Sequence, residues 1–194
     1  MENQLTPEQS LATIEAMISQ AKQSFHRMSY YFLLWGVLLI LGMATQLVAA
    51  SSGWSDHGYG MGVVGILGGV MSALHGAREG KRERVQTAMD RVFVWLWAAF
   101  IITMLVTMFG AGIAGYSTPA ASIMVLTGLP TFLTGQMMRF KPLIFGGILF
   151  WVLGAACFFV EPVVMATLYI VAMLFGYVVP GYLLKRQEDG LRTA

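Results

Sequence analysis

Charged side chains are scarce in this chain of 194 residues: Asp, Glu, Lys and Arg make up 11% of it, whereas a typical soluble domain carries about 25%. Apolar residues make up 57% of the chain. A chain of this composition has too little polar surface to face water on all sides, which excludes an ordinary soluble domain.

Acidic residues are missing where an ion-coupled transporter would need them. Six long apolar segments contain no Asp, Glu, Lys or Arg: 30–50, 59–77, 92–110, 118–138, 143–160 and 163–184. Proton and sodium coupling relies on carboxylates inside the membrane, so their absence argues against an ion-coupled pump.

The chain also contains almost no cysteine. The single Cys157 lies in the fifth segment, which excludes an intramolecular disulfide.

The six apolar segments have the length of membrane spans. As a helix, residues 30–50 cover about 31 Å, which matches the hydrocarbon core of about 30 Å in a bilayer. We therefore predict an all-α polytopic membrane bundle, with an amphipathic cytoplasmic helix in residues 1–29, six transmembrane helices in 30–184 and a short cytoplasmic tail in 185–194. The first segment is expected to be retained, because it is too long for the apolar region of a signal peptide.

Basic residues indicate the orientation of the spans. All 12 Lys and Arg residues lie before the first segment, after the sixth, or in the loops that join the second to the third and the fourth to the fifth. The positive-inside rule then predicts that both termini are cytoplasmic. The basic run at 75–91 is a topology signal that meets anionic lipid headgroups. Nucleic acid is not an expected partner, because three acids interrupt this run and no aromatic side chain in it offers a stacking surface.

The N-terminal segment reads as a capped helix with one apolar face. The helix would have Thr6 as its N-cap and Pro7 at its first position. Gln9, at the third helical position, completes a capping box with Thr6. Apolar residues then recur three or four positions apart: Leu11, Ile14, Ile18, Ala21, Phe25 and Met28. A helix that lies on anionic lipid is usually rich in Lys and Arg, whereas the charges here balance. We therefore expect a protein surface as the partner of this stripe: the helix's own bundle, a second copy, or another protein.

The fourth and sixth segments each carry a proline among small or polar residues. Pro130 has no N–H for the carbonyl of Leu126, so a kink or break is expected there, and Pro180 likewise frees the carbonyl of Gly176. One interpretation is a solute pathway; the other, which we favour, is ordinary packing of small residues in membrane helices. The candidate pathway or kink residues are Thr127, Gly128, Pro130, Thr131, Thr134, Gly176 and Pro180.

Glycines dominate the second segment. They include two GxxxG pairs, Gly58 with Gly62 and Gly65 with Gly69, which let another helix approach closely. These four glycines predict either a central packing helix or part of a homo-oligomer interface.

The six spans also allow two kinds of internal repeat, three hairpins or two inverted halves, and the sequence does not choose between them.

Residues that carry chemistry are few and scattered. His75 is interpreted as an interfacial side chain, and the neighbours Asp56 and His57 are too few for a metal or hydrolytic site. Met104 and Met108 share a helix face, where flexible packing is the usual role of methionine. We therefore predict no catalytic residues, no metal and no cofactor, and expect that the protein is not an enzyme.

Two stretches carry a resemblance. The motifs YYFLLWG at 30–36 and GYVVPGYLLKR at 176–186 resemble small, uncharacterised six-span inner-membrane proteins of bacteria. The resemblance implies a location in the bacterial inner membrane and no functional residues. The expected function is that of an accessory, sensory or assembly protein that acts through helix–helix and protein–protein contacts. The alternative is a channel or uncoupled small-solute transporter with a pathway at the fourth span.

Overall fold

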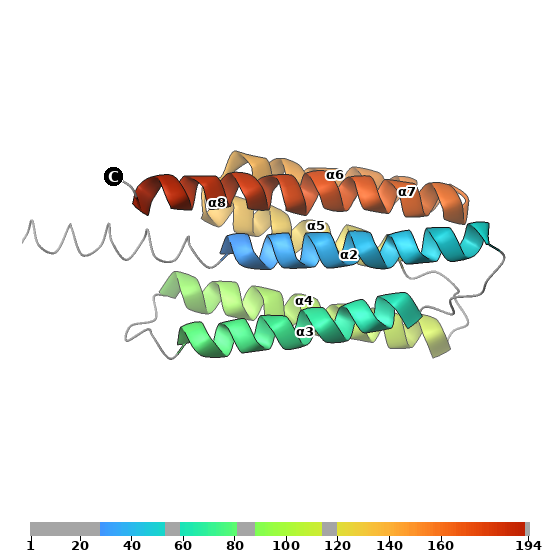
Figure 1. Cartoon of the computed structure of the whole chain (residues 1–194), viewed down its shortest axis with the longest axis horizontal. Coiled ribbons are helices and arrows are strands. Elements are labelled where there is room, and N and C mark those ends of the chain that lie inside the picture. The colour runs from blue at the N-terminus through green and yellow to red at the C-terminus, as the bar shows by residue number, and fades with distance from the viewer. Residues whose placement is uncertain (1–27, 53–58, 81–87, 114–119, 193–194) are drawn as a thin grey trace, which may run out of the picture.

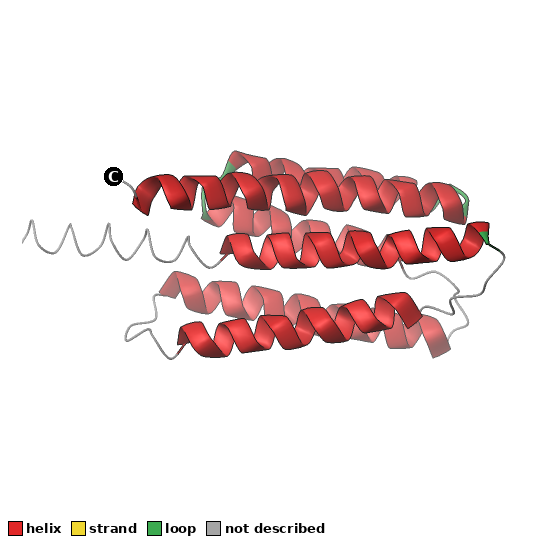
Figure 2. Ribbon diagram, in the orientation of Figure 1, coloured by secondary structure: helices red, strands yellow, loops and turns green. Residues whose placement is uncertain are grey.

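The computed structural model describes residues 28–52, 59–80, 88–113 and 120–192, and every regular element within them is a helix (Figure 2). The predicted amphipathic helix at 1–29 lies outside these residues except for its end. The helices, in chain order, are α2 (Met28–Ser51), α3 (Tyr59–Gly80), α4 (Ala88–Ile113), α5 (Ala120–Met137), α6 (Lys141–Ala156), α7 (Pro162–Met173), the π-helical segment η1 (Leu174–Val178) and α8 (Val179–Arg192).

The helices alternate in direction along one common axis, except that α7, η1 and α8 continue in the same direction (Figure 1). α3, α5 and α8 therefore end at the side of the bundle where α2, α4 and α6 begin. Arg78 lies in the last turn of α3, and Arg139 and Lys141 lie at the junction of α5 and α6. The fold thus gathers the basic segments at one end of the bundle, as the positive-inside pattern requires.

Four helical stretches are long and apolar enough to cross a membrane: 28–49, 60–78, 91–110 and 162–187. α5 and α6 have 18 and 16 residues, so they rise about 27 Å and 24 Å, slightly less than a hydrocarbon core of about 30 Å. The described residues therefore support a helical membrane protein, with four candidate spans by length and composition.

Within the predicted fifth span, 143–160, the helix ends before the segment does. α6 stops at Ala156, and residues 157–160 form a turn. Proline is the physical reason for the longer connection. Pro162 occupies the first turn of α7, where it needs no N–H donor, and it holds the preceding Glu161 in an extended conformation with ψ of 157°. The chain therefore leaves the helix before Glu161 in order to reverse.

The last three elements form one continuous rod with a π-helical turn inside it (Figure 1). The backbone N–H of Val179 donates to the carbonyl of Leu174, five residues earlier. Pro180 follows directly and has no N–H for the carbonyl of Gly176. The widened turn thus occurs where proline already interrupts the ladder of hydrogen bonds, a common setting for a π-bulge.

The core lies where α2, α5, α6 and the α7–η1–α8 rod meet. Tyr177 on η1 is at its centre: its ring lies 5.0 Å from Phe150 of α6 and 5.4 Å from Phe32 of α2, between centroids. Both phenylalanine side chains are buried. On the other side of Phe32, Trp97 of α4 packs with a centroid distance of 6.1 Å. These aromatic contacts join the last rod to α2, and α2 to α4.

α3 and α4 both lie at the edge of the bundle, where α3 packs on α2 and α4 packs on α5. None of the most apolar stretch of α4 is buried, and only 11% of that of α3 is, against 28% in α2 and 33% in the last rod. A polar contact joins α3 to α2: the Trp35 indole N–H donates to the Ser72 hydroxyl at 3.1 Å. Nearby, the rings of Tyr30 and His75 stack at 3.9 Å. α3 and α4 thus leave most of their apolar surface to lipid or to another protein.

Candidate functional site

The threonine stripe of α5 is enclosed by its neighbours. Thr127 is 4% exposed, and Thr131 and Thr134 are 0% exposed. Because the last two have no surface that water can reach, they do not line an open aqueous channel in this conformation. α5 also continues through Pro130 to Met137, so the proline does not break the helix.

Two of the three threonine hydroxyls bond within their own helix. Thr127 donates to the carbonyl of Ile123 and Thr131 to that of Thr127, both at 2.7 Å. The hydroxyls of Thr131 and Tyr177 are 3.5 Å apart, at the upper limit of a hydrogen bond. Thr134 Oγ1 is buried with no partner among the described residues. Except at Thr134, the threonine hydroxyls of the stripe therefore donate to backbone carbonyls one turn earlier in α5, as threonine often does in membrane helices.

Glycines bring α5 and α6 into backbone contact. A Cβ on Gly128 would lie 2.5 Å from the indole of Trp151 and 2.9 Å from the carbonyl oxygen of Gly147. A Cβ on Gly147 would lie 2.6–2.7 Å from Cβ, Cα and N of Phe132. Such distances leave no room for a side chain, so Gly128 serves the packing of the hairpin, as the favoured interpretation of this segment expects.

Two further glycines were missed by sequence reasoning, although a signal for them was present. A Cβ on Gly135 would lie 2.7 Å from the amide nitrogen of Ile144, and one on Gly154 would lie 2.8 Å from the side chain of Val125. Gly128 and Gly135 are seven residues apart, as are Gly147 and Gly154. Two matching heptad pairs of glycine on adjacent segments predict an antiparallel small-residue seam.

Gly176 forms the second close approach to α6. A Cβ on Gly146 would lie 2.7 Å from the Gly176 carbonyl oxygen, so the Cα–H of Gly146 points at this oxygen. Since Pro180 removes the usual helical donor for that carbonyl, a Cα–H···O contact of this kind partly replaces it. On the same segment, a Cβ on Gly176 would lie 2.6 Å from the ring of Phe150. The structure thus brings five candidate residues, Thr127, Gly128, Thr131, Thr134 and Gly176, to the interfaces around α6, and buries Pro130 and Pro180 with them.

The glycines predicted to pack α3 have no neighbour in the described structure. Nothing lies within 4 Å of a Cβ placed on Gly62, Gly65 or Gly69, and Gly58 lies outside the described residues. Gly68 is the exception, because the ring of Trp35 covers it at 2.8 Å. α3 is therefore a peripheral helix with one docked face and one open glycine face, which we define as Gly62, Gly65 and Gly69.

Only the last residue of the N-terminal stripe, Met28, is described, and it packs half-buried against the core. Leu11, Ile14, Ile18, Ala21 and Phe25 lie outside the described residues. Among the described residues, no group of three or more His, Cys, Asp or Glu side chains is placed to hold a metal ion.

Comparison of the chain with protein-family models, with curated proteins and with solved structures gives no match.

Proposed function

We propose that this protein is a six-span component of the bacterial inner membrane, with both termini in the cytoplasm, that acts as an accessory, sensory or assembly protein through helix–helix contacts. The gathering of basic segments at one end of the bundle supports this orientation. α5 and α6 are slightly short, but a bilayer thins locally around short helices at a modest cost. The proposal gives the protein no catalytic role.

The open glycine face of α3 is the observation that carries this function. Large apolar side chains suit lipid, and Ile66 of α3 is 70% exposed. Glycine contributes little to a lipid contact and raises the conformational entropy cost of forming a helix. Its benefit in a membrane helix is the close approach of a second backbone. Within the described residues that second helix is absent, so we infer that it belongs to another molecule, most simply a second copy of α3.

Leucine substitutions on this face test the function directly. We expect the full-length protein in nanodiscs to be a dimer by native mass spectrometry, and Gly65→Leu with Gly69→Leu to be monomeric. The fold should persist, because both positions have open space around them. Gly110→Leu on α4 is the matched control, since Gly110 also has nothing within 4 Å. A variant that stays dimeric, or a wild-type protein that is monomeric and captures no membrane partner, would reject the proposal.

The N-terminal stripe is the second contact surface in this proposal. Its charge balance and apolar face favour a protein partner. Deletion of residues 2–24 should weaken self-association or abolish the pull-down of a partner, while the spans remain inserted. If oligomeric state and pull-down were both unchanged by the deletion, the stripe would have no part in the function.

A solute pathway is the second candidate, and the interface of α5 with η1 favours it. The π-helical turn faces the threonine stripe, as the Thr131–Tyr177 contact indicates, and π-bulges recur at functional sites. A pathway here requires α5 and η1 to separate, because the stripe is enclosed in this conformation. Flux of a small solute into proteoliposomes should then fall in Thr131→Val and in Pro130→Ala. Absence of flux, or flux that both variants retain, would count against a channel.

A further inference from the structure

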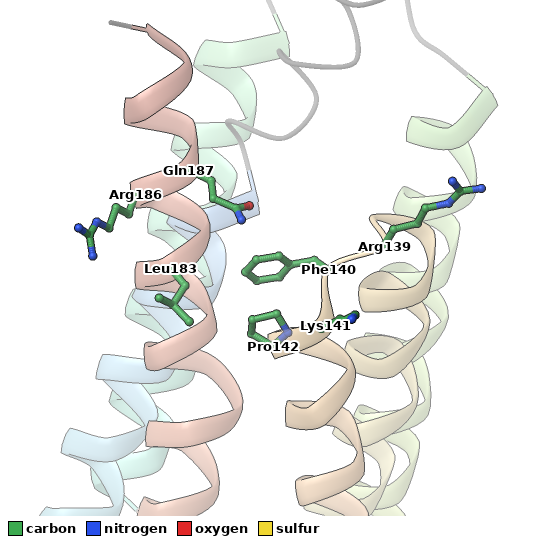
Figure 3. Close-up of a pocket in the computed structure, with 7 residues that line it drawn as sticks. All are labelled: Arg139, Phe140, Lys141, Pro142, Leu183, Arg186 and Gln187. Carbon is green, nitrogen blue, oxygen red and sulfur yellow. The ribbon is translucent and has the colours of Figure 1, made fainter. Parts of the chain in front are cut away.

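A basic cavity opens at the end of the bundle, between α8 and the turn that joins α5 to α6 (Figure 3). Its volume is about 540 Å³, within the range of roughly 300–1,000 Å³ that is usual for small-molecule sites. Among the described residues, three cations, one amide and three apolar side chains line it: Arg139, Lys141, Arg186, Gln187, Phe140, Pro142 and Leu183.

The cavity exists because α5 ends abruptly. Arg139 adopts a left-handed conformation with φ of 51°. The backbone N–H of Phe140 then donates to the carbonyl of Gly135, and that of Arg139 to the carbonyl of Gln136. These two bonds form a Schellman motif, in which the left-handed position is usually glycine. An arginine here has a conformational cost that glycine would avoid.

Apolar and cationic side chains occupy different parts of the cavity lining. Phe140, Leu183 and Gln187 point into the gap between the two elements, while the side chains of Arg139 and Arg186 extend away from it in opposite directions (Figure 3). Phe140 is buried, and the cationic side chains are exposed. The apolar stretch of the last rod ends at Gln187, so the cavity lies where hydrocarbon gives way to headgroups. A ligand in the gap would contact the apolar groups, and the exposed cations would reach it by turning inward from the rim.

We propose that this cavity binds the phosphate-bearing headgroup of an anionic phospholipid, with its glycerol region against Phe140 and Leu183. Basic pockets between membrane helices on the cytoplasmic side recognise such headgroups, and arginine pairs strongly with phosphate oxygens. The apolar lining favours a lipid over free phosphate, which has no apolar part to bury. The site depends on the membrane embedding of α8 and α5–α6, and not on the open glycine face of α3.

The test uses the full-length protein in a neutral detergent with added phosphatidylglycerol or phosphatidylcholine. Native mass spectrometry should find that wild-type protein retains phosphatidylglycerol about tenfold more than phosphatidylcholine, and that Arg139→Gln with Lys141→Gln and Arg186→Gln removes this preference. Arg78→Gln with Arg91→Gln is the control, because these cations lie at the same end of the bundle but outside the cavity. An equal loss in the control, or no preference in the wild type, would overturn the proposal.

Arg139→Gly separates binding from folding. Glycine suits the left-handed position, so the variant should melt at a higher temperature than the wild type without lipid, yet gain less from added phosphatidylglycerol. Inorganic phosphate and glycerol 3-phosphate are measured in parallel by the same melting shift. If either stabilises the wild type as much as phosphatidylglycerol does, the site takes a soluble phosphate, and the lipid assignment fails. If Arg139→Gly gains as much from phosphatidylglycerol as the wild type, Arg139 does not contact the headgroup.

Discussion

Single glycines determine how closely the helices of this protein approach one another. Gly147 has the backbone and Cβ of Phe132 at distances that exclude any side chain, whereas Gly69 faces open space. The same residue type therefore has opposite roles on α6 and on α3. Hydropathy does not distinguish them, because glycine contributes the same value in both places.

Alanine substitution should distinguish these two roles. We expect Gly147→Ala to lower the free energy of unfolding by about 1–3 kcal/mol, because a rigid backbone must shift to admit the methyl group. Gly69→Ala should stay within about 0.5 kcal/mol of the wild type. Reversible unfolding in mixed micelles measures both. Equal effects of the two substitutions would mean that the α5–α6 seam is looser than described.

The unpartnered hydroxyl of Thr134 gives a second prediction at the residue scale. Burial of a hydroxyl without a hydrogen bond is costly, so Thr134→Val, of nearly equal volume, should raise the free energy of unfolding by about 1 kcal/mol. Thr131→Val, which loses a bond of 2.7 Å to the Thr127 carbonyl, should lower it by about 0.6 kcal/mol. The same unfolding assay applies. Destabilisation by Thr134→Val would indicate that its hydroxyl has a partner, such as a bound water.

At the scale of elements, α3 packs through one face on α2, while its glycine face is open. The Trp35–Ser72 hydrogen bond and the cover of Gly68 by the Trp35 ring attach it to α2. The core, by contrast, joins α2 to α6 and η1 through buried rings. α3 and α4, which each have one main neighbour, are therefore the described helices best suited to change partners.

A double-mutant cycle measures how much the Trp35–Ser72 hydrogen bond contributes to the attachment of α3 to α2. Trp35→Phe, Ser72→Ala and the double variant should show a coupling of about 0.6 kcal/mol, the average for hydrogen bonds between membrane helices. Trp35→Phe should also have a further packing effect, because the smaller ring uncovers Gly68. A coupling of zero would mean that the bond between α2 and α3 does not stabilise the folded protein.

At the scale of the whole molecule, the sequence predicts which segments are helices better than it predicts their neighbours. The charge-free segments all fall largely within described helices, because long apolar runs without charge admit few other structures in a membrane protein. The packing faces were harder to predict because lipid and core are both apolar, so α4 resembles a buried helix although none of its most apolar stretch is buried. The cavity was missed because it joins residues 139–142 to 183–187, and no local pattern connects them.

Thiol accessibility distinguishes six spans from four. In a Cys157→Ala background, Ser52→Cys and Glu161→Cys should react in intact cells with a reagent that does not cross membranes, and Gln187→Cys only after permeabilisation. Lys141→Cys is decisive. It should be protected if α5 and α6 cross the membrane, and reactive from outside if they do not. All four positions are exposed in the structure, so burial does not hide them.

The open glycine face of α3 should meet another helix, and cross-linking in native membranes detects this contact where the protein works. In the same Cys157→Ala background, oxidation of Gly65→Cys and Gly69→Cys should yield a covalent dimer, because backbones in GxxxG contact bring these positions together. Gly110→Cys on α4, equally open, should stay monomeric. If neither α3 cysteine forms a dimer, or if Gly110→Cys forms one as readily, the proposed contact between copies does not exist.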